Sequence, residues 1–310
     1  MKTHEGPYDV LIIGGGPAGL TAAVYAARLA LSTAVVAGEV GGQAQWASKV
    51  ENYLGFQLIA GNELVRQFRE HVRRFPVDCY EGEYVNAVVP SGDLFEIFTQ
   101  ESTSLQARAV IIASGRAAAR LAVPGEKELV GRGVSFCATC DGAFFRGHPV
   151  AVVGPGEAAA EAALQLSRLE CQVTLVSQRP LRVPEELLRK LEADPRIEQH
   201  IGWNVVAIEG ADTVEAVLLR DAAQTEERRA VAAVFIERGF IPPDEFTGGI
   251  VQTNERGEIV VARDNMTSQP GIFAAGDVTD DYGKQIIIAA GEGARASMAV
   301  ASWLRRRDVA

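Results

Sequence analysis

Short apolar runs recur along the chain, and glycine turns or amphipathic stretches separate them. Residues 9–13 and 33–36 are almost continuously apolar, which is typical of parallel strands buried on both faces. The alanine-rich stretch 20–29 between them predicts a helix. Strand, glycine turn, helix and strand in this order predict a βαβ unit at the start of the chain.

The same pattern returns further along the chain, and its positions match those of the first unit without a gap. Residues 150–153 predict a strand, the next helix continues to about residue 169, and residues 173–176 predict the second strand. The matching pairs, all separated by the same offset, are Gly14 and Gly154, Gly16 and Gly156, and Val36 and Val176. We infer two Rossmann-like units, although such a unit can also bind nothing, an alternative that is more open for the second.

The rest of the pattern adds elements around these units. It predicts helices over 62–75, 185–191 and 285–303, and strands over 85–88, 94–97, 109–112 and 271–275, with several more between 205 and 235. Turn residues at 124–126 and 239–243 indicate linkers. The alternation of strands and helices predicts an α/β fold.

Composition narrows the class of protein. The chain has 310 residues, 47% of them hydrophobic, which is enough for two domain cores. Its net charge of -10 argues against a nucleic acid or an anionic membrane as partner. Residues 1–8 predict no secretion signal, and glycines and Arg28 interrupt the apolar run 10–30, so we expect a cytoplasmic protein without a membrane span. The scattered histidines His4, His71, His148 and His200 predict no metal site.

The C-x-x-C pair of Cys137 and Cys140 is the first candidate for chemistry. In such a pair one thiolate attacks a substrate disulfide and the other thiol resolves the mixed disulfide. Asp141 follows directly and could carry the proton that this exchange requires. Half of a zinc site and two structural thiols are the alternatives, but zinc needs four ligands and Cys79 and Cys171 each stand alone. We expect these two cysteines to be buried as small hydrophobic side chains.

The first glycine turn has the G-x-G-x-x-G spacing of dinucleotide-binding folds. Gly14 permits the tight turn, Gly16 lets a pyrophosphate approach the backbone, and Gly19 lets helix and strand pack closely. The ribose-binding acid expected after the second strand is not clear, because Gly38 stands there and Glu39 comes late. Glu39 is equally explained as a solvated loop charge.

Together these motifs resemble the low-molecular-weight thioredoxin reductase family over the whole length of the chain. The matching stretches are residues 14–19 (GGGPAG), 41–43 (GGQ), 50–52 (VEN), 137–142 (CATCDG), 276–278 (GDV), Gln285 and 290–293 (AGEG). The resemblance implies a homodimeric flavoprotein of two Rossmann-like domains with three-layer ββα architecture, the second inserted in the first. FAD would lie in a discontinuous domain, residues 1–117 and 246–310, and residues 118–245 would form an NAD(P)H-binding-like domain that carries the C-x-x-C.

The resemblance also implies roles for individual residues. Cys140 would take electrons from the flavin, Cys137 would attack the disulfide of a thioredoxin-like protein, and Asp141 would shuttle the proton. The residues that would bind FAD are Gly14, Gly16, Pro17, Ala18, Gly38, Gly42, Gln43, Asn52, Val85, Ala113, Gly115, Gly276, Asp277, Gln285 and Ile286. Of these, Gln285 and Ile286 would approach the isoalloxazine from a helix N-terminus.

The second unit departs from the family where a nicotinamide cofactor would bind. Pro155 replaces a glycine, and Glu157 stands at the helix N-terminus, where a carboxylate would disfavour a pyrophosphate by about 1–3 kcal/mol. Glu237-Arg238-Gly239 replaces an Ala-Ile-Gly stretch of the family. The degenerate NADPH site would comprise Gly154, Gly156, Arg179 and Arg182.

These departures leave the electron donor open. Either NADPH binds weakly to an ordinary thioredoxin reductase, or, as we favour, the nicotinamide site is vestigial and reduced ferredoxin or another one-electron protein reduces FAD. Trp46 could stack over the flavin face that a nicotinamide would use. A non-catalytic, FAD-binding redox sensor is the third hypothesis, but the intact Cys137, Cys140 and Asp141 argue against it.

Overall fold

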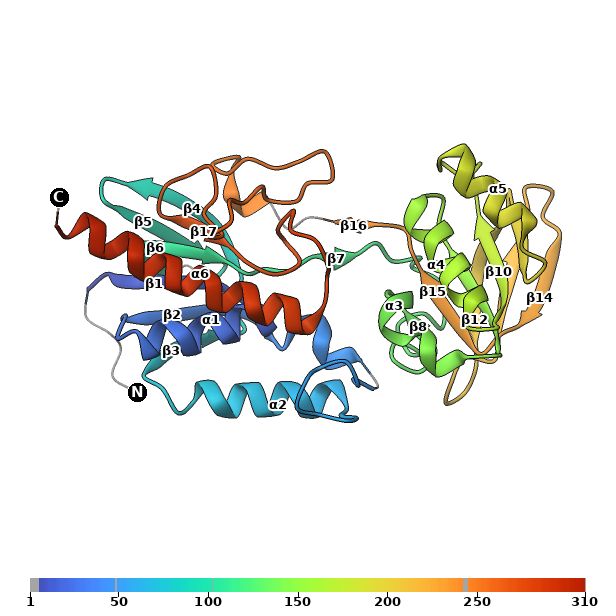
Figure 1. Cartoon of the computed structure of the whole chain (residues 1–310), viewed down its shortest axis with the longest axis horizontal. Coiled ribbons are helices and arrows are strands. Elements are labelled where there is room, and N and C mark those ends of the chain that lie inside the picture. Colours follow the sequence, from blue (N-terminus) through green and yellow to red (C-terminus); the bar gives the residue numbers. More distant parts are fainter. Residues whose placement is uncertain (1–5, 48, 102, 242–244, 310) are drawn as a thin grey trace. The chain divides into compact units, whose positions relative to one another are not determined.

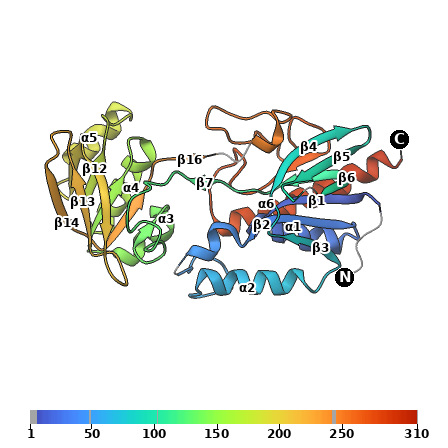
Figure 2. The same cartoon turned by 180° about the vertical axis from the view of Figure 1, so that it is seen from behind.

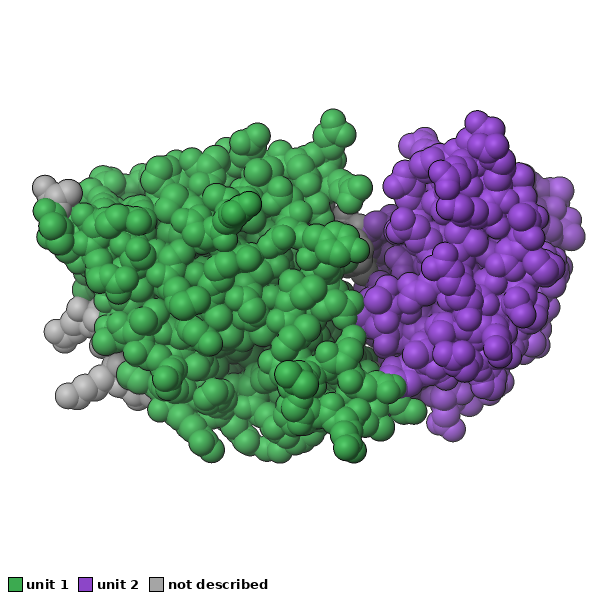
Figure 3. All heavy atoms as spheres, viewed as in Figure 1, with its two compact units in different colours: residues 1–117, 242–310 green, residues 118–241 purple. Residues whose placement is uncertain are grey.

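The computed structural model describes residues 6–47, 49–101, 103–241 and 245–309. The chain divides into two compact units, unit 1 with Met1–Ala117 and Pro242–Ala310, and unit 2 with Ala118–Ile241, which Figure 3 shows in green and purple. Unit 2 is therefore inserted in unit 1. The sequence predicts an insert that ends at residue 245 and a linker over residues 239–243. Residues 242–244 lie outside the described residues, and so do this end of the insert and the last two residues of the linker.

Unit 1 is built on a mixed sheet with the strand order β3-β2-β1-β6-β5-β4, and β17 pairs with β6 (Figure 1). Its elements are β1 (Tyr8–Gly15), α1 (Pro17–Arg28), β2 (Thr33–Val40), η1 (Gly42–Trp46), α2 (Gly61–Val72), β3 (Val77–Glu81), β4 (Val85–Ser91), β5 (Leu94–Thr99), β6 (Ser104–Ile112), η3 (Glu245–Thr247), β17 (Ile272–Ala274) and α6 (Ile286–Arg307). The central strands β2, β1 and β6 run parallel, as the continuous apolar runs predict.

The core of unit 1 forms two layers of side chains because successive residues of a strand point to opposite faces. Val10 and Ile12 of β1 pack with the helices α1 and α6, which lie side by side in Figures 1 and 2. Leu11 and Ile13 pack on the other face with residues of β4 and β5 and with Val251. Strands β4 and β5 belong to the same hydrogen-bonded sheet and bring side chains onto its face opposite the helices, which gives the predicted ββα architecture.

Unit 2 repeats this arrangement on a smaller scale. Its elements are β8 (Val134–Ser135), α3 (Ala138–Asp141), η2 (Gly142–Phe145), β9 (Pro149–Val153), α4 (Glu157–Arg168), β10 (Gln172–Ser177), α5 (Glu185–Ala193), β11 (Ile197–Ile201), β12 (Asn204–Glu209), β13 (Ala216–Arg220), β14 (Glu226–Ala230) and β15 (Ala233–Ile236). The parallel sheet has the order β11-β10-β9-β15-β8, and β12, β13 and β14 form a separate antiparallel sheet. The predicted pair of Rossmann-like sheets is confirmed.

The position-by-position match between the two units also holds in the structure. Helices α1 and α4 both have 12 residues and begin directly after Gly16 and Gly156. Each ends before a residue with left-handed backbone, Ala30 with φ 59° and Glu170 with φ 63°. The chain passes between the units through two short strands, β7 (Ala117–Ala118) and β16 (Phe240–Ile241), which pair with each other, and β16 lies within the predicted linker 239–243.

One prediction about the free cysteines is wrong. Cys171 is buried, but Cys79 is exposed. Strand β3 lies at the edge of its sheet, where a side chain has fewer neighbouring strands and helices to cover it. Over the described part of the chain, the helices are too short or too polar to cross a bilayer.

Candidate functional site

The glycine turn after β1 is fixed by close backbone contacts. Gly14 has φ 114°, and a Cβ there would lie 2.2 Å from the carbonyl oxygen of Ala113. A Cβ on Gly19 would lie 1.9 Å from the carbonyl oxygen of Gly14. A Cβ on Gly16, in contrast, would meet no described atom within 4 Å. The chain itself therefore requires glycine at positions 14 and 19, whereas Gly16 keeps an open edge in front of the helix.

That edge suits a negatively charged group. Helix α1 begins with Pro17 and carries no acidic residue in its first turn. Its N-cap is Gly16, which has no side chain that could accept a hydrogen bond from the first N–H groups of the helix. Ser114, just past the end of β6, has a buried hydroxyl without a hydrogen-bond partner among the described residues. Free N–H groups, the positive end of the helix dipole and an unsatisfied hydroxyl together fit the pyrophosphate of a dinucleotide.

Two predicted flavin contacts from distant parts of the sequence lie together in unit 1. The side-chain amide of Asn52 donates to Gln285 Oε1 over 3.0 Å. Gln285 is the N-cap of α6, whose first turn from Ile286 contains no acidic residue. Gln43 in η1 donates through Nε2 to the carbonyl oxygen of Arg116 over 2.5 Å. These contacts join η1 to the chain just after β6, and the segment between η1 and α2 to the start of α6.

The turn after β17 contributes the predicted Gly276 and Asp277. Gly276 has φ 83°, and its N–H donates to the buried carboxylate of Glu292 over 2.7 Å. Burial raises the pKa of Glu292, an effect that hydrogen bonds from Gly276 and Thr279 oppose. Burial also raises the pKa of Asp277, which Arg116 opposes from 3.7 Å. An acid in this position can accept hydrogen bonds from the hydroxyls of a bound polyol chain.

The remaining predicted FAD residues lie in unit 1 around the same strand ends. A Cβ on Gly38 would lie 2.1 Å from the ring of the half-exposed Tyr84, so a larger residue there would require that ring to move. Val85 begins β4, Ala113 is buried directly after β6, and Gly115 has φ 68°. Gly42 begins η1 with φ 54°, and Ala18 is buried beneath Gly276. Glu39 is exposed and accepts a hydrogen bond from Gln45 over 3.3 Å, as a solvated charge would, but it lies near the end of strand β2 and not in the predicted loop.

In unit 2, Cys137 and Cys140 form a disulfide with 5.3 Å between their Cα atoms. Cys137 is the N-cap of the short helix α3, and its sulfur accepts from the N–H of Cys140 over 3.1 Å. Ser135 supports the turn because its hydroxyl accepts from the N–H of Cys137 over 3.1 Å. Burial raises the pKa of Asp141, and its hydrogen bond with Ser135 opposes this. The pair is therefore a disulfide beside a carboxyl that holds its proton more tightly than a surface aspartate.

The second glycine turn differs from the first. Gly154 lies against unit 2 backbone, since a Cβ there would be 2.1 Å from the carbonyl oxygen of Glu237. Glu157 is exposed and is the first residue of α4, directly after its N-cap Gly156. The N–H of Arg182 donates to the carbonyl oxygen of Pro155 over 2.7 Å. The second turn thus has the shape of a phosphate site, but its helix begins with the carboxylate of Glu157, where the first helix has none.

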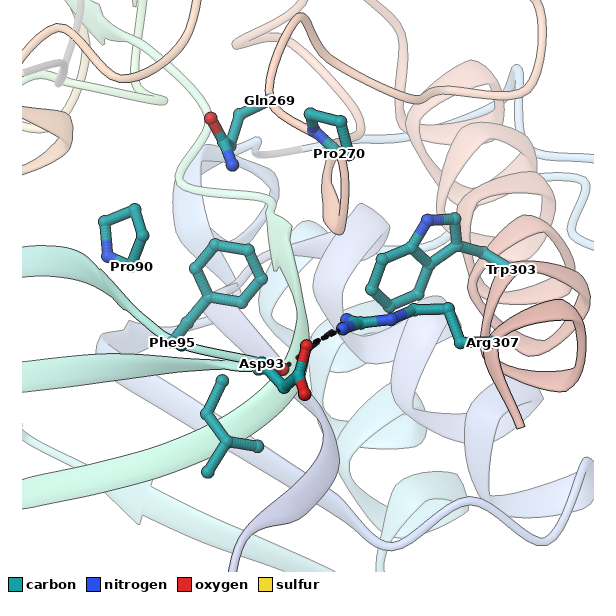
Figure 4. A pocket seen from close by; sticks show the side chains of 9 residues that line it. Pro90, Asp93, Phe95, Gln269, Pro270, Trp303 and Arg307 are labelled. Carbon is teal, nitrogen blue, oxygen red and sulfur yellow. Dashed lines mark hydrogen bonds and ion pairs between the residues drawn. The ribbon is translucent and has the colours of Figure 1, made fainter. Parts of the chain in front are cut away.

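A separate hollow of about 340 Å³ lies at the other end of α6 (Figure 4). Arg307 pairs with Asp93 across it, and the Arg307 guanidinium lies 4.8 Å from the centre of the Trp303 ring. Pro90, Phe95, Gln269 and Pro270 complete most of the lining. It contains none of the predicted site residues.

Sequence reasoning missed three residues of the candidate cofactor site, Ser114, Arg116 and Glu292. Ser114 could have been found, because a hydroxyl follows directly after the fully apolar run 109–113. Glu292 could also have been found, because it is an acid between two glycines on the buried face of an otherwise apolar stretch. Nothing in the sequence singles out Arg116, which pairs with Asp277 from a distant part of the chain.

Comparison with known proteins agrees with these features. The family model described as pyridine nucleotide-disulphide oxidoreductase matches residues 8–293. A thioredoxin reductase of Mycolicibacterium smegmatis is 42% identical, over 99% of this chain and 100% of that protein. The F subunit of the alkyl hydroperoxide reductase of Pseudomonas putida is 39% identical over 96% of this chain, which spans only 58% of that longer relative.

Solved structures give the same result. The thioredoxin reductase of Streptococcus pyogenes superposes with a TM-score of 0.93 at 37% identity, over 98% of this chain and 100% of that one. The thioredoxin reductase of Giardia duodenalis superposes with a TM-score of 0.91 at 32% identity, over 97% of this chain and 100% of that one. The chain thus belongs to the low-molecular-weight thioredoxin reductase family of pyridine nucleotide-disulphide oxidoreductases, which bind FAD and carry a redox-active disulfide.

Proposed function

We propose that this protein passes electrons from FAD through Cys137 and Cys140 to the disulfide of a thioredoxin-like protein. The observation that carries the proposal is the Cys137–Cys140 disulfide at the start of α3, followed by the buried carboxyl of Asp141. Cys140 faces the flavin in this scheme, Cys137 attacks the partner disulfide, and Asp141 transfers the proton. Exchange of this kind suits a reducing compartment such as the cytosol.

Unit 1 is the proposed FAD-binding domain. When bound, FAD supplies the capacity to take electrons singly or as a hydride and to pass on two. Gly14, Gly16, Pro17 and Ala18 would hold the pyrophosphate, and Ser114 would add a hydroxyl to it. The fit rests on the open edge before α1 and on the unsatisfied hydroxyl.

The flavin half of FAD would lie at the start of α6. Asn52 and Gln285, already joined to each other, would contact the ring system, and Asp277 would bind the ribityl chain. The N–H groups after Gln285 can stabilise negative charge, because the helix begins there without an acidic first turn. FAD would also be contacted by Gly38, Gly42, Gln43, Val85, Ala113, Gly115, Gly276 and Ile286. As in the family, we expect two chains to pair.

We propose further that the electron donor is a one-electron protein such as ferredoxin and that NADPH is not the donor. Glu157 occupies the first position of α4, where a pyrophosphate needs the free N–H groups. Glu237 adds a second carboxylate at the end of the neighbouring strand β15. Trp46, 40% exposed in η1, is the proposed cover for the flavin face that a nicotinamide would use.

An ordinary NADPH-dependent reductase is the second candidate, and Arg182 favours it. Arg182 forms a β-bridge with Gly156, which keeps its backbone beside the glycine turn, and Arg179 lies close before it in the sequence. In this scheme the guanidinium groups of Arg182 and Arg179 would bind the 2′-phosphate.

Anaerobic mixing of the purified flavoprotein with NADPH, NADH or reduced ferredoxin tests the donor. We expect ferredoxin to bleach the oxidised flavin band and both nicotinamides to leave it unchanged, with dithionite as the positive control. Rapid bleaching at micromolar NADPH would overturn the protein-donor proposal and establish the second candidate. A redox sensor without turnover would instead be reduced by ferredoxin but would fail to pass electrons to any thioredoxin.

A further inference from the structure

Glu237 lies beside the disulfide turn because of the strand order in unit 2. Strands β15 and β8 run parallel, with Val234 opposite Val134 and Phe235 opposite Ser135. The same register, continued past the ends of both strands, brings Glu237 level with Cys137. Its carboxylate accepts a hydrogen bond from the N–H of Ala138, the residue after Cys137, over 3.3 Å.

The backbone of Glu237 is itself held firmly. Its N–H donates to the carbonyl oxygen of Val153, at the end of β9, over 2.8 Å. Its carbonyl oxygen lies so close to Gly154 that any side chain at position 154 would collide with it. The carboxylate is therefore attached to the rigid end of the central sheet, which is a suitable base for positioning a reactive group.

Three side chains from other elements support the disulfide turn. Ser135 contacts it from β8, and Gln165 of α4 donates to the carbonyl oxygen of Ala138 over 3.5 Å. Glu237 contacts it from the end of β15. Of these three, only Glu237 brings a charge to the turn, and it does so at an N–H group that could otherwise stabilise a thiolate.

We propose that Glu237 is a positioning residue for the Cys137–Cys140 pair. Its carboxylate holds the first turn of α3 through Ala138, and its charge disfavours a free thiolate at Cys137. This inference rests on the proposed function. There, reduction breaks the S–S bond and adds two electrons and one proton from the reduced flavin, which leaves one thiol and one thiolate. Glu237 disfavours the remaining negative charge on Cys137.

Thiol reactivity tests the charge. The holoprotein is reduced anaerobically and treated with iodoacetamide at neutral pH, and the alkylation rate of the Cys137 peptide is followed by mass spectrometry. Glu237→Gln keeps an acceptor for the Ala138 N–H but removes the charge. We expect its Cys137 to react about threefold to tenfold faster than in the wild type, as loss of a neighbouring charge predicts.

Hydrogen exchange tests the positioning. Glu237→Ala removes the acceptor as well as the charge, so the Ala138 amide in the oxidised protein should exchange about tenfold faster, as loss of a charge-assisted hydrogen bond predicts. Glu161→Gln is the matched control, because Glu161 is an exposed acid of the same unit on α4. It should change neither readout.

The two parts of the proposal fail separately. An alkylation rate of Glu237→Gln within twofold of the wild type would overturn the charge effect, and unchanged exchange at Ala138 in Glu237→Ala would overturn the positioning. Neither measurement uses an electron donor or a thioredoxin. If both readouts shift but the wild type reduces no protein disulfide, the proposed function is wrong and the role of Glu237 stands.

Discussion

The two glycine turns of this chain have nearly the same backbone arrangement but differ in charge, because only the second is followed by a helix that begins with a carboxylate. Gly14 packs against the carbonyl of Ala113, and Gly154, its counterpart in unit 2, packs against the carbonyl of Glu237. Each turn leads into a helix of 12 residues. The first helix begins with proline and alanine, whereas the second begins with Glu157.

This difference distinguishes the glycine that packing of the βαβ unit requires from the uncharged helix start that binding of a phosphate requires. Both turns keep the glycine that packs against the neighbouring strand, because the βαβ unit cannot close without it. Of these two turns, only the one before α1 leaves an open backbone edge without a carboxylate, where a phosphate could bind. The Rossmann-like sheet of unit 2 thus supports a disulfide, while the helix after its glycine turn begins with a carboxylate.

The largest effect is expected from Gly19→Ala, which tests the packing half of the comparison. The new Cβ would lie 1.9 Å from the carbonyl oxygen of Gly14, so the helix or the turn must move. We expect a loss of about 3 kcal/mol in the free energy of unfolding, together with loss of FAD on gel filtration. The matching position in unit 2 is Ala159, and Ala159→Gly should cost only about 1 kcal/mol. Full retention of FAD by Gly19→Ala would contradict the role of this contact.

Asp141→Asn tests whether the scaffold of unit 2 still serves catalysis. We expect thioredoxin reduction to slow about 100-fold, as loss of a proton-transferring group predicts. Because burial raises the pKa of Asp141, the wild-type carboxyl keeps its proton at pH values at which a surface aspartate has already lost it. The step that needs this proton should slow as pH rises through that raised pKa, and the asparagine variant should lack this dependence.

Asp212→Asn, at an exposed aspartate of unit 2, is the control for this experiment. It should keep both the rate and the pH profile of the wild type. If Asp141→Asn behaves in the same way, Asp141 is not the proton carrier.

Glu157→Gln sharpens the electrostatic half of the comparison. Removal of the carboxylate from the first position of α4 should tighten NADPH binding about tenfold, which corresponds to about 1.4 kcal/mol. Isothermal titration of the oxidised flavoprotein measures this directly, with Glu161→Gln as the matched control on the same helix. Equal affinities in the wild type and Glu157→Gln would show that Glu157 does not keep the nucleotide away.

The smallest effect concerns Glu292 in unit 1. Burial raises the pKa of this carboxyl, so the folded state binds its proton more tightly than the unfolded state does. The stability of the wild type should therefore fall as pH rises from the usual carboxyl range through the raised pKa. Glu292→Gln carries no charge and should be more stable than the wild type by about 1 kcal/mol at about pH 8, with the difference vanishing at about pH 4. Thermal unfolding at equal FAD occupancy measures this, and a constant difference across that range would contradict it.

Much of the local structure could be predicted from the sequence. The apolar runs identified β1, β2, β9 and β10 within a few residues, because buried parallel strands need continuous apolar side chains. The helix predicted over residues 20–29 is α1, which begins three residues earlier at Pro17 because proline fits the first helical position. Cys79 was an exception, because its exposure depends on β3 being an edge strand, and no single segment of the sequence determines the order of strands in a sheet.

What the sequence determined by itself is the chemistry that depends on neighbours along the chain: two matching glycine turns and a C-x-x-C followed by an acid. Only the tertiary structure decided which distant groups meet. It joins Asn52 to Gln285 and brings the carboxylate of Glu237 to Ala138. The physical reason is that turns and helix starts follow from local backbone preferences, whereas these contacts arise when nonadjacent strands pair and bring their ends to one edge of a sheet.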